Sequence, residues 1–146
     1  MGSKLDHSIW SFCYAKGQLP RDFIEGSPVG SNQGMLPIPM VYTVIVTPPS
    51  APQRSVFLVD AGFAAARSMT GRAFADFESP AAILGKVELE AREVKTLLLT
   101  HMHFDHMGNI EAFPEANILL QRSEYDWWKW ALGALPEHSH DKQNWV

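Results

Sequence analysis

Apolar residues recur along this chain in short blocks, separated by segments rich in glycine, proline and serine. Short apolar blocks with many β-branched and aromatic residues are typical of β-strands. The blocks predict strands over residues 40–46, 55–59, 95–100 and 117–121. The first two flank a proline-rich turn, residues 47–54, and we expect them to pair as a hairpin.

The sequence predicts helices after the second, third and fourth of these strands. Ser79 and Pro80 are preferred residue types at an N-cap and at the first helical position, so we predict a helix that starts there and ends near Lys86. A longer helix is predicted to start with Ser123 as its cap and carries acidic residues in its first turn. A short helix is expected over residues 109–113. The longer helix has a run of aromatic residues that predicts a buried or interface-forming surface: Tyr125, Trp127, Trp128 and Trp130.

The beginning of the chain lacks such a pattern. Residues 1–35 are rich in glycine, serine and proline, and we expect them to form an irregular N-terminal lead. Aromatic side chains along the lead are expected to pack onto the domain formed by residues 36–146; they are Trp10, Phe12, Tyr14 and Phe23. The lead is therefore predicted to be part of the folded structure and not a free tail.

Composition restricts the class of protein. A chain of 146 residues with 46% apolar residues fits one globular domain. The net charge of −4 provides no basic surface for nucleic acid, so we expect no nucleic-acid partner. No stretch approaches the ~20 apolar residues of a membrane span, and the N-terminus lacks a signal-peptide pattern. Because Cys13 is the single cysteine, no internal disulfide can form, and we expect a cytoplasmic protein with no membrane partner.

Four potential metal ligands lie within six residues, directly after the predicted strand 95–100: His101, His103, Asp105 and His106. Imidazole and carboxylate groups are the side chains that bind zinc, iron and manganese. Residues two apart in an extended segment project to the same side, and a tight turn can bring Asp105 and His106 to the same point. A single histidine is usually an ordinary surface or core residue, but four such groups together would need many partners without a metal. The sequence therefore predicts a metal site at this strand end.

Two segments resemble landmarks of one family. Residues 100–109, THMHFDHMGN, resemble the H-x-H-x-D-H signature of the metallo-β-lactamase superfamily, and residues 56–62, VFLVDAG, resemble its strand ending in Asp-x-Gly that supports the metal site. Phe104 and its surroundings are most similar to the branch that contains N-acyl-homoserine lactone lactonases. The resemblance extends over about residues 40–130. It implies an α/β fold of the αββα metallo-β-lactamase type, of which this chain would be the N-terminal half, a mixed β-sheet with flanking helices.

The resemblance implies roles for five residues. His101 and His103 would bind a first metal ion, and Asp105 and His106 a second. Asp105 could also pass a proton to the leaving group. Asp60 would orient a metal-binding histidine through its other ring nitrogen, although a turn or helix-cap role is common for aspartate. Two zinc ions are expected in the complete site, where iron, manganese or cobalt could replace them.

By the same resemblance, the complete site also uses a third histidine, a bridging aspartate and a last histidine, all downstream of the signature. The later histidines of this chain, His138 and His140, lie in a polar, turn-like tail that does not match those motifs. A solvated loop is the favoured interpretation of this tail. We therefore expect the chain to be the N-terminal half of a family member and to be inactive without the missing ligands.

Three functions are consistent with the sequence. The first is a metal-dependent hydrolase, a quorum-quenching lactonase or a relative, in which a metal-bridging hydroxide attacks the carbonyl carbon of a small-molecule lactone or ester. The second is another hydrolase of the superfamily, acting on a thioester, an aryl ester or an amide. The third is a catalytically inactive metal-binding module. The oligomeric state stays open, with a homo-oligomer as one outcome.

Overall fold

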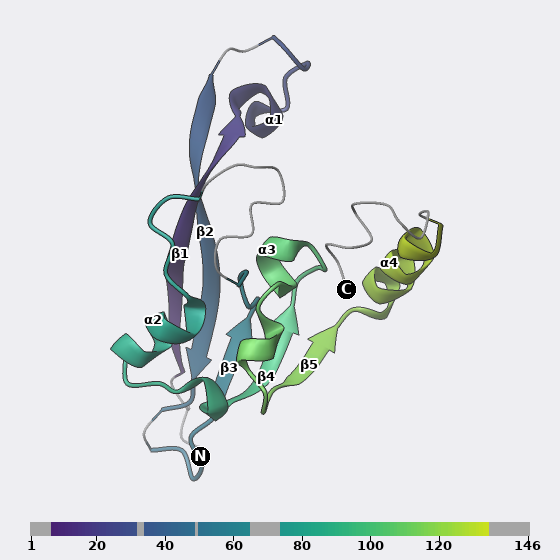
Figure 1. Cartoon of the computed structure of the whole chain (residues 1–146). Coiled ribbons are helices and arrows are strands. Elements are labelled where there is room, and N and C mark those ends of the chain that lie inside the picture. Colours follow the sequence, from purple (N-terminus) through teal and green to yellow (C-terminus); the bar gives the residue numbers. More distant parts are fainter. Residues whose placement is uncertain (1–6, 32–33, 49, 65–73, 135–146) are drawn as a thin grey trace, which may run out of the picture.

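The computed structural model describes residues 7–31, 34–48, 50–64 and 74–134, which form a mixed sheet with helices beside it (Figure 1). The sheet has the strand order β1-β2-β3-β4-β5. The strands are β1 (Ser8–Pro20), β2 (Met35–Val46), β3 (Val56–Val59), β4 (Val94–Leu99) and β5 (Asn117–Leu120). The α-helices are α1 (Arg21–Glu25), α2 (Pro80–Lys86), α3 (Phe104–Met107) and α4 (Arg122–Ala134). Short 3-10 helices, η1 (Ala91–Glu93) and η2 (Ile110–Ala112), precede β4 and β5.

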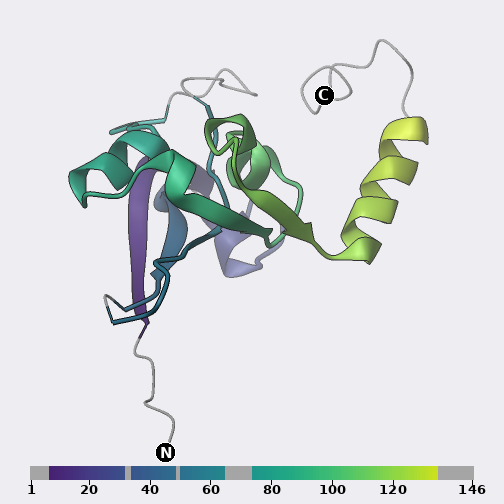
Figure 2. The ribbon, with the colours of Figure 1, turned by 90° about the horizontal axis from the view of Figure 1, so that it is seen from below.

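Strand direction changes in the middle of the sheet. β1, β2 and β3 pair antiparallel, whereas β3, β4 and β5 pair parallel. Parallel neighbours need a crossover connection, and α2 lies in the connection from β3 to β4 while α3 lies in the one from β4 to β5. Both helices lie on the same side of the sheet (Figure 2). The predicted mixed β-sheet with flanking helices is therefore confirmed.

The hydrophobic core lies between the sheet and these helices. Tyr42 and Val44 of β2, Leu58 of β3 and Leu97 of β4 are at most 1% exposed and belong to one cluster with Leu84 of α2. Alternate residues of a strand point to opposite faces, so these strands contribute alternate side chains to the core, except at the start of β4, where a register shift separates the buried Val94 from Leu97 by three positions. Burying a leucine of this kind stabilises the fold by roughly 1.5–3 kcal/mol.

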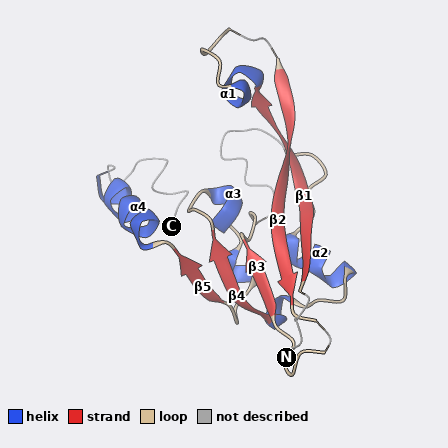
Figure 3. Ribbon diagram, turned by 180° about the vertical axis from the view of Figure 1, so that it is seen from behind, coloured by secondary structure: helices blue, strands red, loops and turns tan. Residues whose placement is uncertain are grey.

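The opposite face of the sheet carries a second row of side chains. The strand register places Thr43 beside Val59, Val59 beside Leu98 and Leu98 beside Leu119. Leu98 and Leu119 are 44% and 52% exposed. Figure 3, seen from behind, shows the strands on the near side and α2 and α3 beyond them. The crossover helices therefore cover only the core face.

The expectation of an irregular lead was wrong for most of that segment. Ser8–Pro20 form β1, which pairs with β2 along its whole length, with one irregularity between Cys13 and Ala15. The backbone groups of β2 satisfy those of β1, and this pairing outweighs the weak strand propensity around Lys16 and Gly17. Of the lead's aromatic residues, Tyr14 is buried as predicted, whereas Phe23 on α1 is 73% exposed. A domain boundary after residue 35 stays a prediction.

β1 and β2 extend beyond the rest of the sheet. β3 pairs only with residues 43–46 of β2, whereas β1 pairs with β2 throughout. The distal parts of β1 and β2 therefore form a two-stranded ribbon that projects from the sheet and carries α1 at its tip (Figure 1). On the ribbon, Lys16 and Ala75 exchange backbone hydrogen bonds of 2.8 and 2.9 Å.

The other predicted elements are present with small shifts of their bounds. Ser79 Oγ accepts a hydrogen bond from Ala82 N at 3.3 Å, which confirms Ser79 as the N-cap of α2. The prediction that Ser123 caps the last helix was wrong, because α4 begins at Arg122 and Ser123 lies inside it. The short helix expected over residues 109–113 is the 3-10 helix η2. Within the described ranges, no helix has both the length and the apolar character needed to cross a membrane.

Candidate metal centre

The predicted metal ligands gather where β3 and β4 end. These strands run parallel, so Asp60 after β3 and Thr100 after β4 reach the same edge of the sheet. Asp60 N donates a hydrogen bond of 2.8 Å to Leu98 O, which fixes the two strand ends together. The chain then passes through His101 and His103 in a segment without regular structure and enters α3, which contains Asp105 and His106. A four-residue helix within the motif was not predicted.

The carboxylate of Asp60 connects the residues at this edge through hydrogen bonds. Asp60 is 6% exposed and has a φ of 63°, a left-handed conformation that aspartate adopts more readily than most residues. Its Oδ1 accepts hydrogen bonds from Thr100 N at 2.9 Å and Thr100 Oγ1 at 3.0 Å, and its Oδ2 accepts one from His106 Nδ1 at 2.8 Å. Burial acts to raise the pKa of Asp60, but the hydrogen bonds from His106 and Thr100 outweigh it and lower the pKa below its usual value. Asp60 therefore carries its negative charge into the interior.

The three imidazoles face one another. The His101 and His106 ring centroids are 3.9 Å apart, and those of His101 and His103 are 4.5 Å apart. His101 Nδ1 lies 3.0 Å from Thr100 Oγ1, and His101 Nε2 lies 2.9 Å from His103 Nδ1. We assign the single hydroxyl hydrogen of Thr100 to Asp60, so Thr100 Oγ1 accepts from His101 Nδ1. This assignment leaves the lone pair of His101 Nε2 directed at His103.

Asp105 and His106 form a second pair. His106 Nε2 lies 3.5 Å from Asp105 Oδ2. The carboxylates of Asp105 and Asp60 raise the pKa of His106 to about 9, with hydrogen bonding as the main cause and burial acting against it. Burial, together with the neighbouring imidazoles of His106 and His103, lowers the pKa of His101. Since a metal binds neutral imidazole, an ion at His106 would have to displace a proton.

The donor atoms fit a metal as two pairs. Zinc binds nitrogen at about 2.0–2.1 Å in tetrahedral geometry, which places two ligand nitrogens about 3.3 Å apart. The contacts of 2.9 Å between His101 and His103 and 3.5 Å between Asp105 and His106 lie on either side of that spacing. Among the residues that the structure describes, no group of three or more His, Cys, Asp or Glu side chains is arranged around a single ion. Each pair therefore offers part of a coordination sphere, and the four metal-ligand roles stay predictions.

Residues outside the motif also hold it in place. Tyr14 of β1 donates a hydrogen bond from its hydroxyl to Asp105 O at 2.8 Å. Glu124 Oε1 accepts from Met102 N at 2.9 Å and from Trp128 Nε1 at 2.8 Å, and the Met102 hydrogen bond is the main cause of the lowered pKa of Glu124. From the sequence, Tyr14 was predicted to pack onto the domain and Glu124 to lie in the first turn of a helix. No local pattern pairs them with a segment so distant along the chain.

Phe104 anchors α3 from within the motif. Its ring centroid lies 5.8 Å from that of Phe63 and 6.3 Å from that of Phe74. These aromatic contacts hold the first residue of α3 against the core. Asp60 was predicted to orient a metal-binding histidine, and this role requires a contact such as the one between Asp60 and His106. The orienting role itself stays a prediction. His138 and His140 lie outside the described residues.

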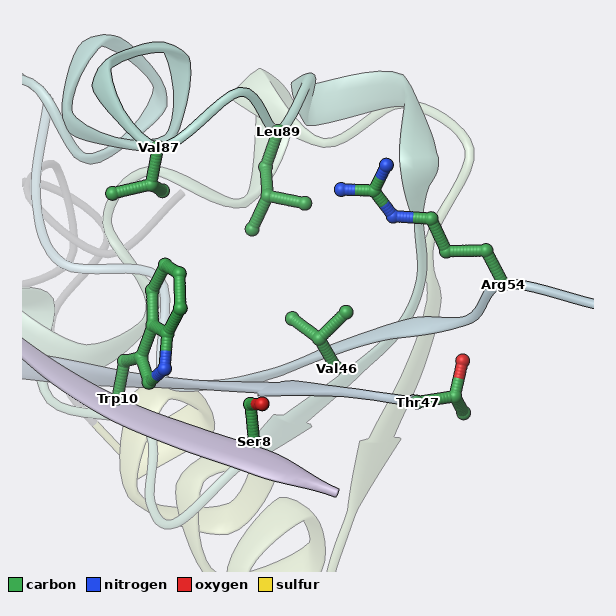
Figure 4. A pocket seen from close by; sticks show the side chains of 7 residues that line it. All are labelled: Ser8, Trp10, Val46, Thr47, Arg54, Val87 and Leu89. Carbon is green, nitrogen blue, oxygen red and sulfur yellow. The ribbon is translucent and has the colours of Figure 1, made fainter. Parts of the chain in front are cut away.

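A cavity of about 270 Å³ lies at the other end of the sheet, where β1 begins and β2 ends (Figure 4). Its lining is mainly apolar, with a guanidinium and two hydroxyl groups: Ser8, Trp10, Val46, Thr47, Arg54, Val87 and Leu89. None of the predicted site residues lines it. The cavity is therefore separate from the candidate metal centre.

Comparison with known families agrees with this geometry. The sequence matches the metallo-beta-lactamase superfamily over residues 40–143, and the chain belongs to this superfamily. A probable metallo-hydrolase of Mycobacterium tuberculosis is 32% identical over 89 residues, which cover 50% of this chain and 29% of that protein. A probable metallo-hydrolase of Mycobacterium bovis matches with the same values.

Several solved structures are similar in fold, and two of them illustrate the similarity. One is an N-acyl homoserine lactone hydrolase with the product N-hexanoyl-L-homoserine bound at its catalytic metal centre; its TM-score is 0.66 at 20% identity, over 95% of this chain and 55% of that chain. The other is a dizinc quorum-quenching lactonase with a TM-score of 0.54 at 14% identity, over 90% of this chain and 47% of that chain. These similarities confirm the expected α/β metallo-β-lactamase fold. The chain spans about half the length of these structures and under a third of the curated relatives.

Proposed function

We propose that this chain forms the metal-binding part of a metal-dependent hydrolase that opens a lactone ring, with an N-acyl-homoserine lactone or a related lactone as substrate. The proposal depends on the pairing of His101 with His103 and of Asp105 with His106 at one strand edge, linked to the buried Asp60. The activities named for the two similar structures, a lactone hydrolase and a dizinc lactonase, support the substrate class and the choice of zinc.

The chain's own residues would divide the chemistry between them. Two bound divalent ions would supply Lewis acidity and lower the pKa of water towards neutrality. His101 Nε2 and His103 Nδ1 would hold one ion, and Asp105 and His106 the other. Asp60 fixes the His106 ring by accepting its Nδ1 hydrogen, so that Nε2 stays on the side of Asp105. The Asp105 carboxylate would accept a proton from the attacking water and pass it to the ring oxygen of the lactone as the ring C–O bond breaks.

We further propose that residues 36–146 form the N-terminal half of the hydrolase domain, to whose sheet the preceding segment adds strand β1. A tetrahedral site needs four donors for each ion, and each pair here provides two. The substrate is proposed to be a small molecule. Lactone opening at ordinary enzyme rates is therefore expected only when further donors complete the coordination of both ions.

Metal analysis of variants of the full chain tests the ligand assignment. Zinc content after equilibration and desalting should fall sharply in His103→Ala, because one nitrogen of the first pair is lost. His7→Ala is the matched control. His7 is exposed and directly precedes β1, whose first residue lies in register with the first residue of β3, whereas the candidate centre follows the last residue of β3. Unchanged zinc content in His103→Ala would refute the ligand assignment, and a chain without zinc would favour an inactive module.

A substrate panel then separates the hydrolase classes. The protein for this test is a zinc-loaded form that includes the further metal-coordinating side chains. Its turnover would be compared on an N-acyl-homoserine lactone, a thioester and an aryl ester. Preferred turnover of the lactone supports the proposal. Preferred turnover of the thioester or the aryl ester would assign the chain to another hydrolase class of the superfamily.

A further inference from the structure

We infer that Glu124 is a positioning residue for the candidate metal centre: its carboxylate fixes the backbone between His101 and His103 and thereby sets how their facing nitrogens are presented to an ion. The inference rests on the proposed metal-binding function and extends it to α4, a helix that the motif does not include. Glu124 would act through Met102 and not as a ligand.

The Met102 N–H lies where the sheet no longer provides a partner. The pairing of β4 with β5 ends at Leu99 and Leu120, so the segment that carries His101 and His103 runs beyond the described ladder. Glu124 Oε1 accepts the Met102 N–H at 2.9 Å. A hydrogen bond to a carboxylate is shorter and stronger than one between neutral groups. Glu124 therefore replaces the missing strand partner at the residue between two predicted ligands.

Trp128 holds the Glu124 carboxylate in that position. It lies one turn later on α4 and donates its indole N–H to the same Oε1 at 2.8 Å. Its ring meets the His103 ring edge-on, with centroids 5.8 Å apart and an interplanar angle of 82°. Helix α4 thus contacts the ligand segment twice, once at the backbone of Met102 and once at the imidazole of His103.

The direction of the Glu124 side chain favours this role over a role within the helix. An acidic residue in the first turn usually interacts with the amide groups of its own helix, whereas Glu124 reaches a segment 22 residues away in sequence. Other large side chains of α4 face solvent, with Trp127 and Trp130 54% and 69% exposed. Glu124 and Trp128 therefore connect a largely exposed helix to the metal segment.

Zinc affinity of the full chain, measured by competition with a chromogenic chelator, tests the inference with zinc alone as the probe. Glu124→Ala should bind zinc about tenfold more weakly, as is common when a group that orients a ligand is lost. Glu124→Gln should stay within about threefold of wild type, because the amide oxygen still accepts both hydrogen bonds. Asp126→Ala is the matched control, since Asp126 lies on the same helix, pairs with the exposed Arg122, and should leave zinc affinity unchanged.

A second measurement does not depend on metal. Hydrogen exchange of the Met102 amide in the zinc-free chain should be faster in Glu124→Ala and close to wild type in Glu124→Gln. If Glu124→Ala does not fold, the zinc affinity of Trp128→Phe tests the inference instead. This variant keeps an aromatic ring near His103 and removes the indole N–H that Glu124 accepts. A zinc affinity of Trp128→Phe equal to that of wild type would overturn the inference.

The outcomes separate the inference from the proposed function. Equal zinc affinity in wild type and Glu124→Ala would overturn the positioning role and leave the metal site standing. Absence of zinc binding in wild type would overturn the proposed function and the inference together. Weaker binding in Asp126→Ala as well would assign the effect to α4 as a whole and also overturn the inference.

Discussion

Replacing Asp60 should weaken both the fold and the metal centre. Asp60→Asn keeps the shape and tolerates the left-handed φ of 63°, but it removes the charge that accepts the hydrogen bonds of Thr100 and His106. Hydrogen bonds to a charged group contribute about 1.5–3 kcal/mol. Because Asn retains one acceptor oxygen, we expect the free energy of unfolding to fall by about 2 kcal/mol. Asp60→Ala leaves several donors unsatisfied and should cost about 3–5 kcal/mol.

Urea unfolding followed by circular dichroism, with a chelator present, measures this loss without any contribution from metal. Asp76→Asn is the matched control: Asp76 also has a positive φ, of 53°, but its carboxylate is 67% exposed in an ion pair with Lys16. The control should change stability by less than about 0.5 kcal/mol. A change in the free energy of unfolding of less than about 0.5 kcal/mol for Asp60→Asn would refute the stabilising role of the Asp60 hydrogen bonds. Zinc affinity of Asp60→Asn should also fall about 10–100-fold, since His106 loses its orienting partner.

The remaining predictions concern pH and close packing. Burial and then nearby carboxylates raise the pKa of Tyr14 and of Tyr42, whereas tyrosine in an unfolded chain titrates near pH 10. The stabilisation from these two neutral hydroxyl groups is therefore complete below about pH 10 and is lost progressively as the pH rises above it. Between about pH 9 and pH 11, the free energy of unfolding measured with urea should fall less in Tyr14→Phe than in wild type. Gly62 has a φ of 71°, and a Cβ there would lie 2.9 Å from Pro80 Cγ; thermal unfolding should show Gly62→Ala less stable by about 1–3 kcal/mol, while Gly133→Ala, where a Cβ meets nothing within 4 Å, should be neutral or slightly stabilising.

Features set by local sequence were predictable. The four strands β2 to β5 and the Ser79-capped helix α2 are encoded by apolar blocks and by a cap that acts within three residues. The position of the motif at the end of β4 was predictable for a similar reason, because its residues are adjacent in sequence and directly follow that strand. A contact between Asp60 and the motif was expected from the family resemblance, and the structure adds which histidine Asp60 meets.

Features set by distant partners were not predictable. β1 contains Lys16, Gly17 and Gln18, whose strand propensity is weak, and it forms because the backbone of β2 pairs with it. The helix α3 was missed because its four residues are held by outside groups, among them the hydroxyl of Tyr14. The hydrogen bond from Met102 to Glu124 joins residues 22 positions apart, and sequence spacing alone does not indicate such a contact.

Because the β1–β2 ribbon projects from the sheet, its amides should be less protected from hydrogen exchange than those of the rest of the sheet. A two-stranded hairpin is marginally stable on its own, and three or more strands with a hydrophobic face are needed for independent stability. The distal part of the ribbon lies beyond the reach of β3, so its amides should open without unfolding the core. Protection of the amides from hydrogen exchange should therefore rise from α1 towards residues 43–46. Within the described part of the chain, a protease acting on the folded protein should cut the distal ribbon before it cuts the strand ends that carry the histidines.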